Sequence, residues 1–112
     1  MSAENNIYRI NVYVPESHLE EVKAALFAAG AGKIGDYDSC CWQTKGHGQF
    51  RPLEGSAPYI GQTGKVETVE EYKLEMVCAA GNVKAALEAM IQAHPYEEPA
   101  YDVYKLVNVS GL

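Results

Sequence analysis

The stretch HPYEEPAYDVY, residues 94–104, decides how the second half of this chain folds. Proline has no backbone N–H and disfavours helical geometry in the residue before it. Pro95 therefore ends a helix near His94, and Pro99 keeps Glu98 extended until a strand begins. The joint carries a histidine and two acids, so two interpretations stay open: a solvated turn, or a small ligand or metal site at a subunit boundary.

Working outward from this joint, apolar periodicity predicts alternating strands and helices. In chain order we expect a strand over 7–14, a helix over 17–29, a strand over 36–50, a loop over 51–63, a strand over 65–78, a helix from 82 and a strand over 101–109. Ser17 and Glu20 form a capping-box pattern, and Asn82 is a capping residue for the second helix. Gly30 and Gly32 supply a left-handed stop for the first helix.

The two halves of the chain repeat with an offset of 64 residues. Residues 8–12 lie over 72–76, and 37–38 lie over 101–102, without a gap. One register held through strand, helix and strand indicates two β-α-β units in a single domain, residues 1–112. Interleaved, they give an α+β, ferredoxin-like β-α-β-β-α-β fold, with a four-stranded antiparallel sheet and both helices on one face.

The face of the sheet away from the helices carries large apolar side chains. We assign these by strand alternation, and they are Tyr13, Cys40, Trp42, Val77, Tyr104 and Leu106. The open face of such a sheet is polar in a monomer, and an apolar patch there marks an interface. We therefore expect a homo-oligomer, with Tyr13, Trp42, Val77, Tyr104 and Leu106 at the interface.

Composition narrows the class of protein. The chain has 112 residues, is 47% hydrophobic and 21% charged, and carries a net charge of −6. A nucleic-acid surface needs a basic patch, so nucleic acid is not an expected partner. No apolar run reaches the roughly 20 residues that span a bilayer, and the N-terminus lacks the pattern of a signal peptide. Three cysteines, an odd number, favour reduced thiols in the cytoplasm.

Candidate ligand groups are scattered along the chain. A divalent metal ion is the cofactor we consider, with His94 and Glu98 joined by His47, Cys40 and Cys41 from other segments or subunits. The alternatives are that His94 caps its helix, that His47 is exposed and that the thiols pack in the core or interface. Adjacent strand residues point to opposite faces, so the two neighbouring thiols cannot chelate one ion within a chain.

Glycines in and around the long loop allow backbone to approach a phosphate. These are Gly46, Gly48, Gly61 and Gly64. The loop lacks the lysine-bearing pattern of a phosphate-binding loop, and the chain shows no HExxH or nucleophile–histidine arrangement. No catalytic residue is therefore assigned.

Three stretches carry a resemblance to a known family: GAGKIGDY at 30–37, the 46–64 region with PYIG at 58–61, and HPYEEPAY at 94–101. They resemble the middle domain of the YqfO-type dinuclear-metal family, often labelled GTP cyclohydrolase 1 type 2 homologues. The resemblance implies an inserted domain similar to the PII and CutA proteins, which are ferredoxin-like trimers. These 112 residues are too few to hold the metal-binding halves that flank this domain in the family, so we do not expect hydrolase activity to be carried over.

Three functional hypotheses follow, in order of preference. The first is a non-enzymatic, oligomeric PII/CutA-like binding or regulatory domain for a small ligand or a divalent metal ion, with a trimer implied by the resemblance alone. The second is a structural assembly or protein-interaction module. The third is an enzyme whose site is built between subunits.

Overall fold

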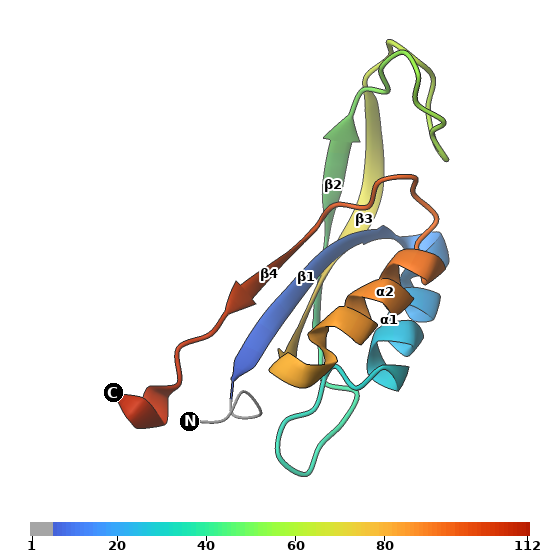
Figure 1. The fold of residues 1–112 in the computed structure, drawn as a ribbon. Helices are drawn as coiled ribbons and strands as arrows, with labels where there is room; N and C mark the ends of the chain where they lie inside the picture. The colour runs from blue at the N-terminus through green and yellow to red at the C-terminus, as the bar shows by residue number, and fades with distance from the viewer. Residues whose placement is uncertain (1–5) are drawn as a thin grey trace.

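The computed structural model describes residues 6–112, and in it two helices cover one face of an antiparallel sheet (Figure 1). The strands and helices are β1 (Ile7–Pro15), α1 (Leu19–Ala28), β2 (Trp42–Phe50), β3 (Glu67–Ala79), α2 (Val83–Ala93) and β4 (Tyr101–Lys105). The strand order is β2-β3-β1-β4, and all neighbours run antiparallel. This is the predicted ferredoxin-like arrangement, which is confirmed.

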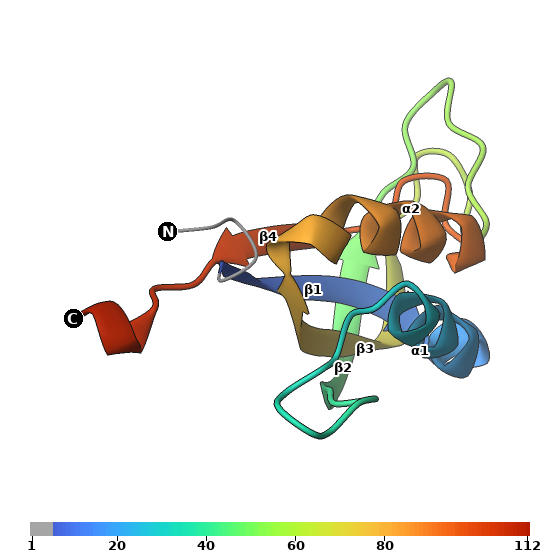
Figure 2. The same ribbon diagram turned by 60° about the horizontal axis from the view of Figure 1, so that its bottom comes forward.

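The core lies between the sheet and the helices (Figure 2). Alternate residues of the two central strands fill it because strand side chains alternate between faces. They pack against one apolar stripe of each helix, as expected from the i, i+3, i+4 spacing. The buried members are Ile10, Val12, Val14, Leu74, Met76 and Cys78 from the strands, and Leu19, Val22, Leu26, Ala86 and Met90 from the helices. Within the described residues, neither helix is long and apolar enough to cross a membrane.

Helix α1 ends as the glycine pattern predicts. Gly30 has φ +102°, its N–H donates to the carbonyl of Phe27, and the next N–H, from Ala31, donates to Leu26. These two bonds form a Schellman motif, which satisfies helix-end carbonyls and favours glycine at the left-handed position.

The predicted N-terminal caps are wrong. The Ser17 hydroxyl bonds to Nδ1 of His18 at 2.8 Å, and Asn82 makes no side-chain capping bond. Both helices are entered through a one-turn 3-10 helix, Glu16–His18 before α1 and Ala80–Asn82 before α2. That tighter turn takes the chain into the helix without the extended cap residue that the capping box requires.

Two predicted strands are too long. The expected 36–50 strand begins only at Trp42, because Gly35 and Ser39 have φ of +55° and +56°, a left-handed conformation that interrupts a strand. The expected 101–109 strand ends at Lys105 and gives way to a 3-10 turn at Val109–Gly111. The repeat match of residues 37–38 with 101–102 therefore pairs a turn with a strand.

An arm built from β2 and β3 extends beyond the helices and carries the connection of residues 51–66 (Figure 1). At its neck the Gly64 N–H donates to the Pro52 carbonyl at 2.8 Å. From this neck the connection folds back toward the joint at 94–100, where the Ala57 N–H donates to Oε1 of Glu97 at 3.1 Å. Two segments far apart in sequence therefore meet at one end of the molecule.

Candidate functional site

The joint between α2 and β4 is built on a buried histidine. Pro95 forces His94 out of the helix into an extended conformation, with φ −78° and ψ 136°. Its side chain turns inward and is 7% exposed. Nε2 lies 2.7 Å from the carbonyl oxygen of Tyr13 on β1, and Nδ1 lies 3.2 Å from the backbone nitrogen of Tyr96.

These two contacts fix the protonation state of the imidazole. A backbone N–H can only donate, so Nδ1 of His94 accepts from Tyr96 and the ring proton sits on Nε2, which donates to the Tyr13 carbonyl. Burial lowers the pKa of His94; the Tyr13 bond opposes this shift, and the charge of His18 adds to it. The interpretation of His94 as a cationic helix cap is therefore wrong: a neutral ring ties the joint to β1.

Tyr96 connects the joint to the arm. Its ring centroid lies 4.8 Å from that of His94, and its hydroxyl donates to Oε2 of Glu71 on β3 at 3.2 Å. Burial raises the pKa of Tyr96, and the charge of Glu71 and its hydrogen bond raise it further, so the hydroxyl keeps its proton. Gly48 makes room for this pairing, because a Cβ there would collide with the Glu71 carboxylate.

A cleft of about 390 Å³ opens between the 51–66 connection and the joint. We call it the arm–joint cleft. Four aromatic rings line it, together with apolar side chains of the connection and four charged groups. The rings are Tyr13, Phe50, Tyr59 and Tyr96; the apolar residues include Pro52, Leu53, Pro58 and Ile60; the charged residues are Arg51, Glu71, Glu97 and Glu98.

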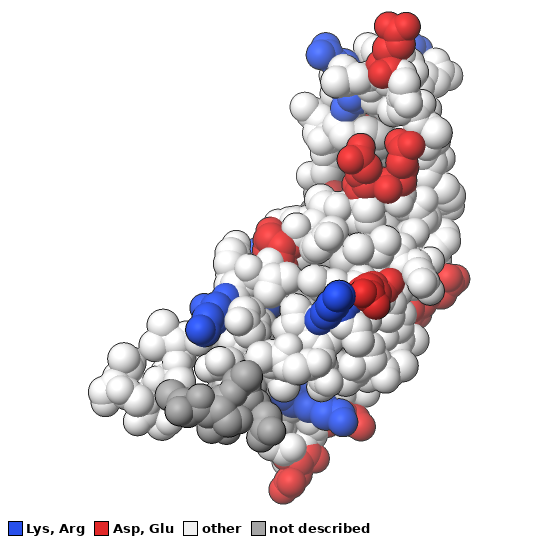
Figure 3. All heavy atoms as spheres, in the orientation of Figure 1, with Lys and Arg blue, Asp and Glu red and all other residues white. Residues whose placement is uncertain are grey.

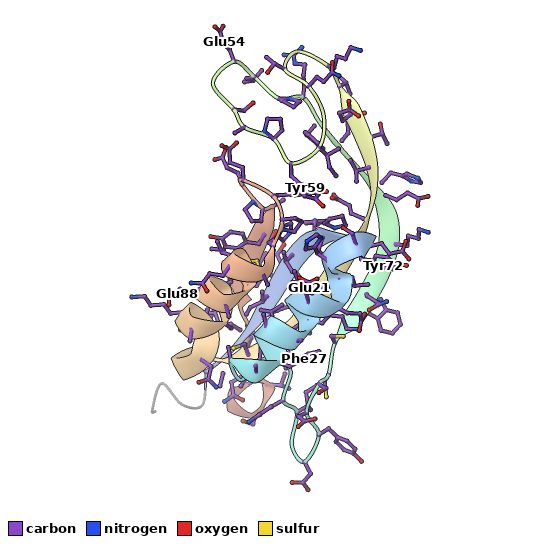
Figure 4. All side chains as sticks on the ribbon, turned by 90° about the vertical axis from the view of Figure 1, so that its right-hand side faces the viewer. Glu21, Phe27, Glu54, Tyr59, Tyr72 and Glu88 are labelled. Carbon is purple, nitrogen blue, oxygen red and sulfur yellow. The ribbon has the colours of Figure 1, made fainter. Side chains whose placement is uncertain are left out.

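Three of the rings form one cluster. Phe50 and Tyr59 each tilt toward Tyr96, with centroids 6.4 and 6.3 Å away. Tyr59 also meets the edge of the His18 ring at 5.8 Å. Figure 4 shows Tyr59 on the part of the connection that turns back toward the helices, while Glu54 marks the outer tip. Such offset contacts add about 0.5–1.5 kcal/mol each beyond simple burial, so they help hold the connection in place.

The predicted metal ligands do not meet within one chain. His47 is exposed on β2, with Nε2 3.9 Å from Oε1 of Glu70, and Cys40 Sγ contacts the Asp38 carbonyl at 3.5 Å. Cys41 packs beside the core, and Glu98 is exposed at the rim of the arm–joint cleft. Among residues 6–112, no three His, Cys, Asp or Glu side chains gather closely enough to hold an ion.

None of the four predicted loop glycines lines the cleft. Gly48 lies under Glu71, Gly61 has φ +94° beside Glu67, Gly64 closes the neck of the connection, and Gly46 has open space above it. Their contribution is to the shape of the arm. The cleft itself is formed by neighbouring side chains that sequence reasoning missed.

The missed residues are Phe50, Arg51, Tyr59 and Glu71. The motif PYIG already singled out Tyr59, so it could have been found. Glu71 could not, because its pairing with Tyr96 joins residues 25 apart through the antiparallel arm and the crossover of α2. No local spacing signals such a contact.

The face of the sheet away from the helices carries the predicted interface side chains. Strand register places Tyr13, Trp42, Val77 and Tyr104 on this open face. Trp42 is 68% and Tyr104 55% exposed. Leu106 follows β4 and donates its N–H to the Ile7 carbonyl, and Cys40 precedes β2, so strand alternation no longer assigns either to this face.

On this open face the buried Asn11 pairs with the exposed Asp102. Asn11 is 1% exposed, and its Nδ2 donates to Oδ1 of Asp102 at 2.8 Å. Within the described residues its Oδ1 accepts no hydrogen bond. A buried acceptor without a donor carries a desolvation penalty of about 1–3 kcal/mol.

Comparison with known proteins shows what this chain is similar to. No family model matches the chain. A GTP cyclohydrolase 1 type 2 homolog of Halalkalibacterium halodurans is 48% identical over 103 residues, which cover 92% of this chain and 28% of that protein. The crystal structure of a Bacillus cereus protein related to NIF3 superposes with a TM-score of 0.80 at 44% identity, over 92% of this chain and 26% of that one.

This chain matches one domain of the GTP cyclohydrolase 1 type 2 homologues. It spans about a quarter of the length of the relatives it matches. CutA from Xylella fastidiosa shares the fold over nearly its whole length, with a TM-score of 0.68 at 22% identity and coverage of 94% of this chain and 88% of CutA. The predicted family resemblance and CutA-like fold are thus confirmed.

Proposed function

We propose that this domain is a non-enzymatic, oligomeric binding module that holds a small ligand in the arm–joint cleft. The proposal rests on the volume and the lining of this cleft. Its volume of about 390 Å³ lies within the range of roughly 300–1,000 Å³ that is usual for small-molecule sites. Aromatic and apolar walls with a few polar groups at one end are also what such sites share.

The contacts across the cleft support a regulatory role. The 51–66 connection meets the joint through one bond from the Ala57 N–H to Glu97 and through the Tyr59–Tyr96 ring contact. These contacts are few, and most of the connection is exposed. A ligand that bridges both walls would favour the closed arrangement and so alter the surface that the arm presents to a partner.

The test is a ligand screen read residue by residue. Amide signals of the isotope-labelled protein are followed by NMR with amino acids, amines, nucleotides and divalent metal ions. A ligand of this site shifts the signals of Tyr96–Ala100 and of the connection. Tyr96→Ala removes the shared wall and should abolish that shift, whereas Tyr37→Ala, which deletes an equally aromatic but 75% exposed ring far from the cleft, should leave it intact. If no compound shifts these signals at millimolar concentration, or if Tyr96→Ala changes nothing, the proposal fails.

A second candidate is assembly through the open face of the sheet. Trp42 and Tyr104 favour it, since exposed aromatic residues of this size commonly dominate interface energetics. We propose a homo-oligomer on this face, a trimer by the family resemblance. Trp42→Glu places a charge where desolvation is costly and should yield a smaller species in light scattering. An unchanged mass for the folded variant would remove this face from the interface.

A divalent metal ion shared between copies remains a separate proposal. It would combine His47, Cys40, Cys41 or Glu98 of one copy with groups of another. His94 contributes only if its bonds to Tyr13 and Tyr96 break. The melting temperature with and without metal tests this proposal directly, because binding to the folded state raises the melting temperature. If zinc, copper and manganese leave the melting temperature the same as in a chelator control, the metal proposal is wrong.

A further inference from the structure

The walls of the arm–joint cleft carry more negative than positive charge. Glu71, Glu97 and Glu98 face one cation, Arg51, which is exposed. Figure 3 shows acidic atoms gathered on the surface between the protruding arm and the body of the molecule. The cleft therefore presents a negative potential to an entering ligand.

We infer that the ligand of this cleft is an organic cation, a small molecule that carries an ammonium or guanidinium group beside an apolar portion. The inference rests on the proposed function and assigns its chemical class. Two kinds of lining group recognise the two parts of such a molecule: carboxylates recognise the charge, and rings and prolines recognise the apolar portion.

A phosphate or carboxylate ligand fits the cleft poorly. It would lie among three carboxylates, with Arg51 as its one cationic partner in the lining. The backbone amide of Ala57 is already engaged by Glu97, so it is not free to bind an anion. Anion sites depend on convergent N–H groups or paired basic side chains.

A bare metal ion also lacks a coordination site here. Glu71, Glu97 and Glu98 line one cleft, yet among the described residues no three acidic, histidine or cysteine side chains converge on a point. A divalent ion needs several ligand atoms at about 2.0–2.6 Å around one centre. Separated carboxylates instead suit an extended cation that offers several N–H groups at different places.

The rings supply the second half of the recognition. Tyr59 and Tyr96 are tilted at 45° with centroids 6.3 Å apart, and Phe50 is tilted at 48° to Tyr96. Rings inclined to one another in this way present faces as well as edges to the space between them. A cation within about 6 Å of such a face is attracted by the ring quadrupole.

The carboxylates divide into two kinds. Glu71 accepts from Tyr96, and Glu97 accepts from Ala57, so both are held in place by the protein. Glu98 makes no hydrogen bond or ion pair within residues 6–112 and lies exposed at the rim. Glu98 is therefore the acid with its full capacity available to a ligand, and Glu97 adds its charge beside it.

The experiment compares three probes that share one ring and differ in charge: 2-phenylethylammonium, 2-phenylethanol and phenylacetate. Each is titrated into the labelled full chain at constant ionic strength, and the signals of Ala57 and Tyr96–Ala100 are followed. We expect the cation to bind at least about tenfold more tightly than the alcohol or the acid, as charge-assisted contacts allow. Added salt should weaken the binding of the cationic probe and leave the binding of the other two probes unchanged.

Paired variants separate local charge from overall charge. Glu98→Gln and Glu97→Gln each remove one negative charge and keep an acceptor oxygen. Each should therefore lower the affinity for the cationic probe roughly threefold to tenfold. Glu88→Gln makes the same change on the outer side of α2, away from the cleft (Figure 4), and should leave the affinity unchanged. Equal losses in all three variants would mean that only net charge matters, and would overturn the inference.

The outcomes also distinguish this inference from the proposed function. If phenylacetate, ATP or zinc shifts the cleft signals as strongly as the ammonium probe, the cleft binds ligands but the organic-cation class is wrong. If neither these probes nor any compound of the wider screen shifts the signals at millimolar concentration, both the class and the proposed function fall.

Discussion

The two helices of this domain end in opposite ways, although they occupy equivalent places in an internal repeat. Helix α1 ends at Ala28, and the chain passes through the Schellman motif at Gly30 into an exposed turn around Ile34 and Tyr37. Helix α2 ends at His94, and the chain turns inward to a buried imidazole. The offset of 64 residues places Gly30 over His94 and Gly32 over Tyr96.

The two connections differ in whether backbone groups or side chains join the helix end to the sheet. The backbone N–H groups of Gly30 and Ala31 satisfy helix-end carbonyls, and the chain then returns to the sheet, where the Gly32 N–H donates to the Val77 carbonyl. At the equivalent positions side chains make the connection: the His94 ring bonds the Tyr13 carbonyl on the sheet, and the Tyr96 ring beside it lines the arm–joint cleft. We call the connection after α1 the conformational connection, because it depends on glycine backbone geometry. We call the connection after α2 the chemical connection, because it depends on hydrogen bonds of the His94 side chain.

The largest expected effect comes from breaking the conformational connection. Gly32 is buried with φ +79°, and a Cβ there would lie 2.8 Å from the Phe27 ring and 2.9 Å from the Cys40 carbonyl. We expect Gly32→Ala to lower the free energy of unfolding by roughly 2–4 kcal/mol, from left-handed strain plus overpacking. Urea denaturation measures this loss.

Gly46→Ala is the matched control, because Gly46 has no atom within 4 Å of the added Cβ and no positive φ. Its effect on stability should be small. A folded Gly32→Ala protein should also keep its ligand affinity, since this connection lies away from the arm–joint cleft. Equal losses in the two variants would show that the tight packing around Gly32 is unimportant.

A smaller loss should follow from breaking the chemical connection. His94→Ala leaves the Tyr13 carbonyl and the Tyr96 N–H without partners in a buried site. We expect a loss of about 2 kcal/mol, the usual penalty for such groups. Unlike Gly32→Ala, it should also weaken ligand binding, because it frees the wall that carries Tyr96. Unchanged affinity in a destabilised His94→Ala protein would separate this joint from the site.

Much of the fold could be predicted because it depends on local pattern. Strand alternation placed Tyr13, Trp42, Val77 and Tyr104 on the open face, and the glycine after α1 predicted the left-handed end of that helix. The strand predicted to start at residue 36 begins only at Trp42, since Ser39 adopts a positive φ that its residue type does not signal. Serine and asparagine at helix starts suggested caps, but a 3-10 entry replaced them.

The site was only half predictable for a physical reason. The proline pair marked the joint, so His94 and Glu98 were found from the sequence. The opposite wall, Phe50 with Arg51 and Glu71, comes from an arm whose fold-back depends on long-range contacts such as Ala57 with Glu97. The interior direction of the His94 ring was equally invisible, because it depends on a carbonyl 81 residues earlier in the chain.

The smallest expected effect is a dependence of stability on pH. Of the two connections, only the chemical connection produces it, because it contains the titratable His94. Burial holds the pKa of His94 below its ordinary value of 6.5. The unfolded imidazole then binds a proton at higher pH than the folded one, so this contribution to stability is complete above about pH 6.5. It is lost as pH falls from there through the folded pKa, since protonated Nδ1 can no longer accept from Tyr96.

His94→Gln isolates this term, because its side chain does not titrate and all other ionisable groups remain. The groups near the ring, His18 and Glu71 beyond Tyr96, are present in both proteins and cancel in the comparison. Urea denaturation of both proteins should give a stability difference that is largest near neutral pH and shrinks as pH falls below about 6.5. A difference that grows on acidification would mean that the folded protein prefers the imidazolium, and the neutral, two-bonded ring at the joint would be wrong.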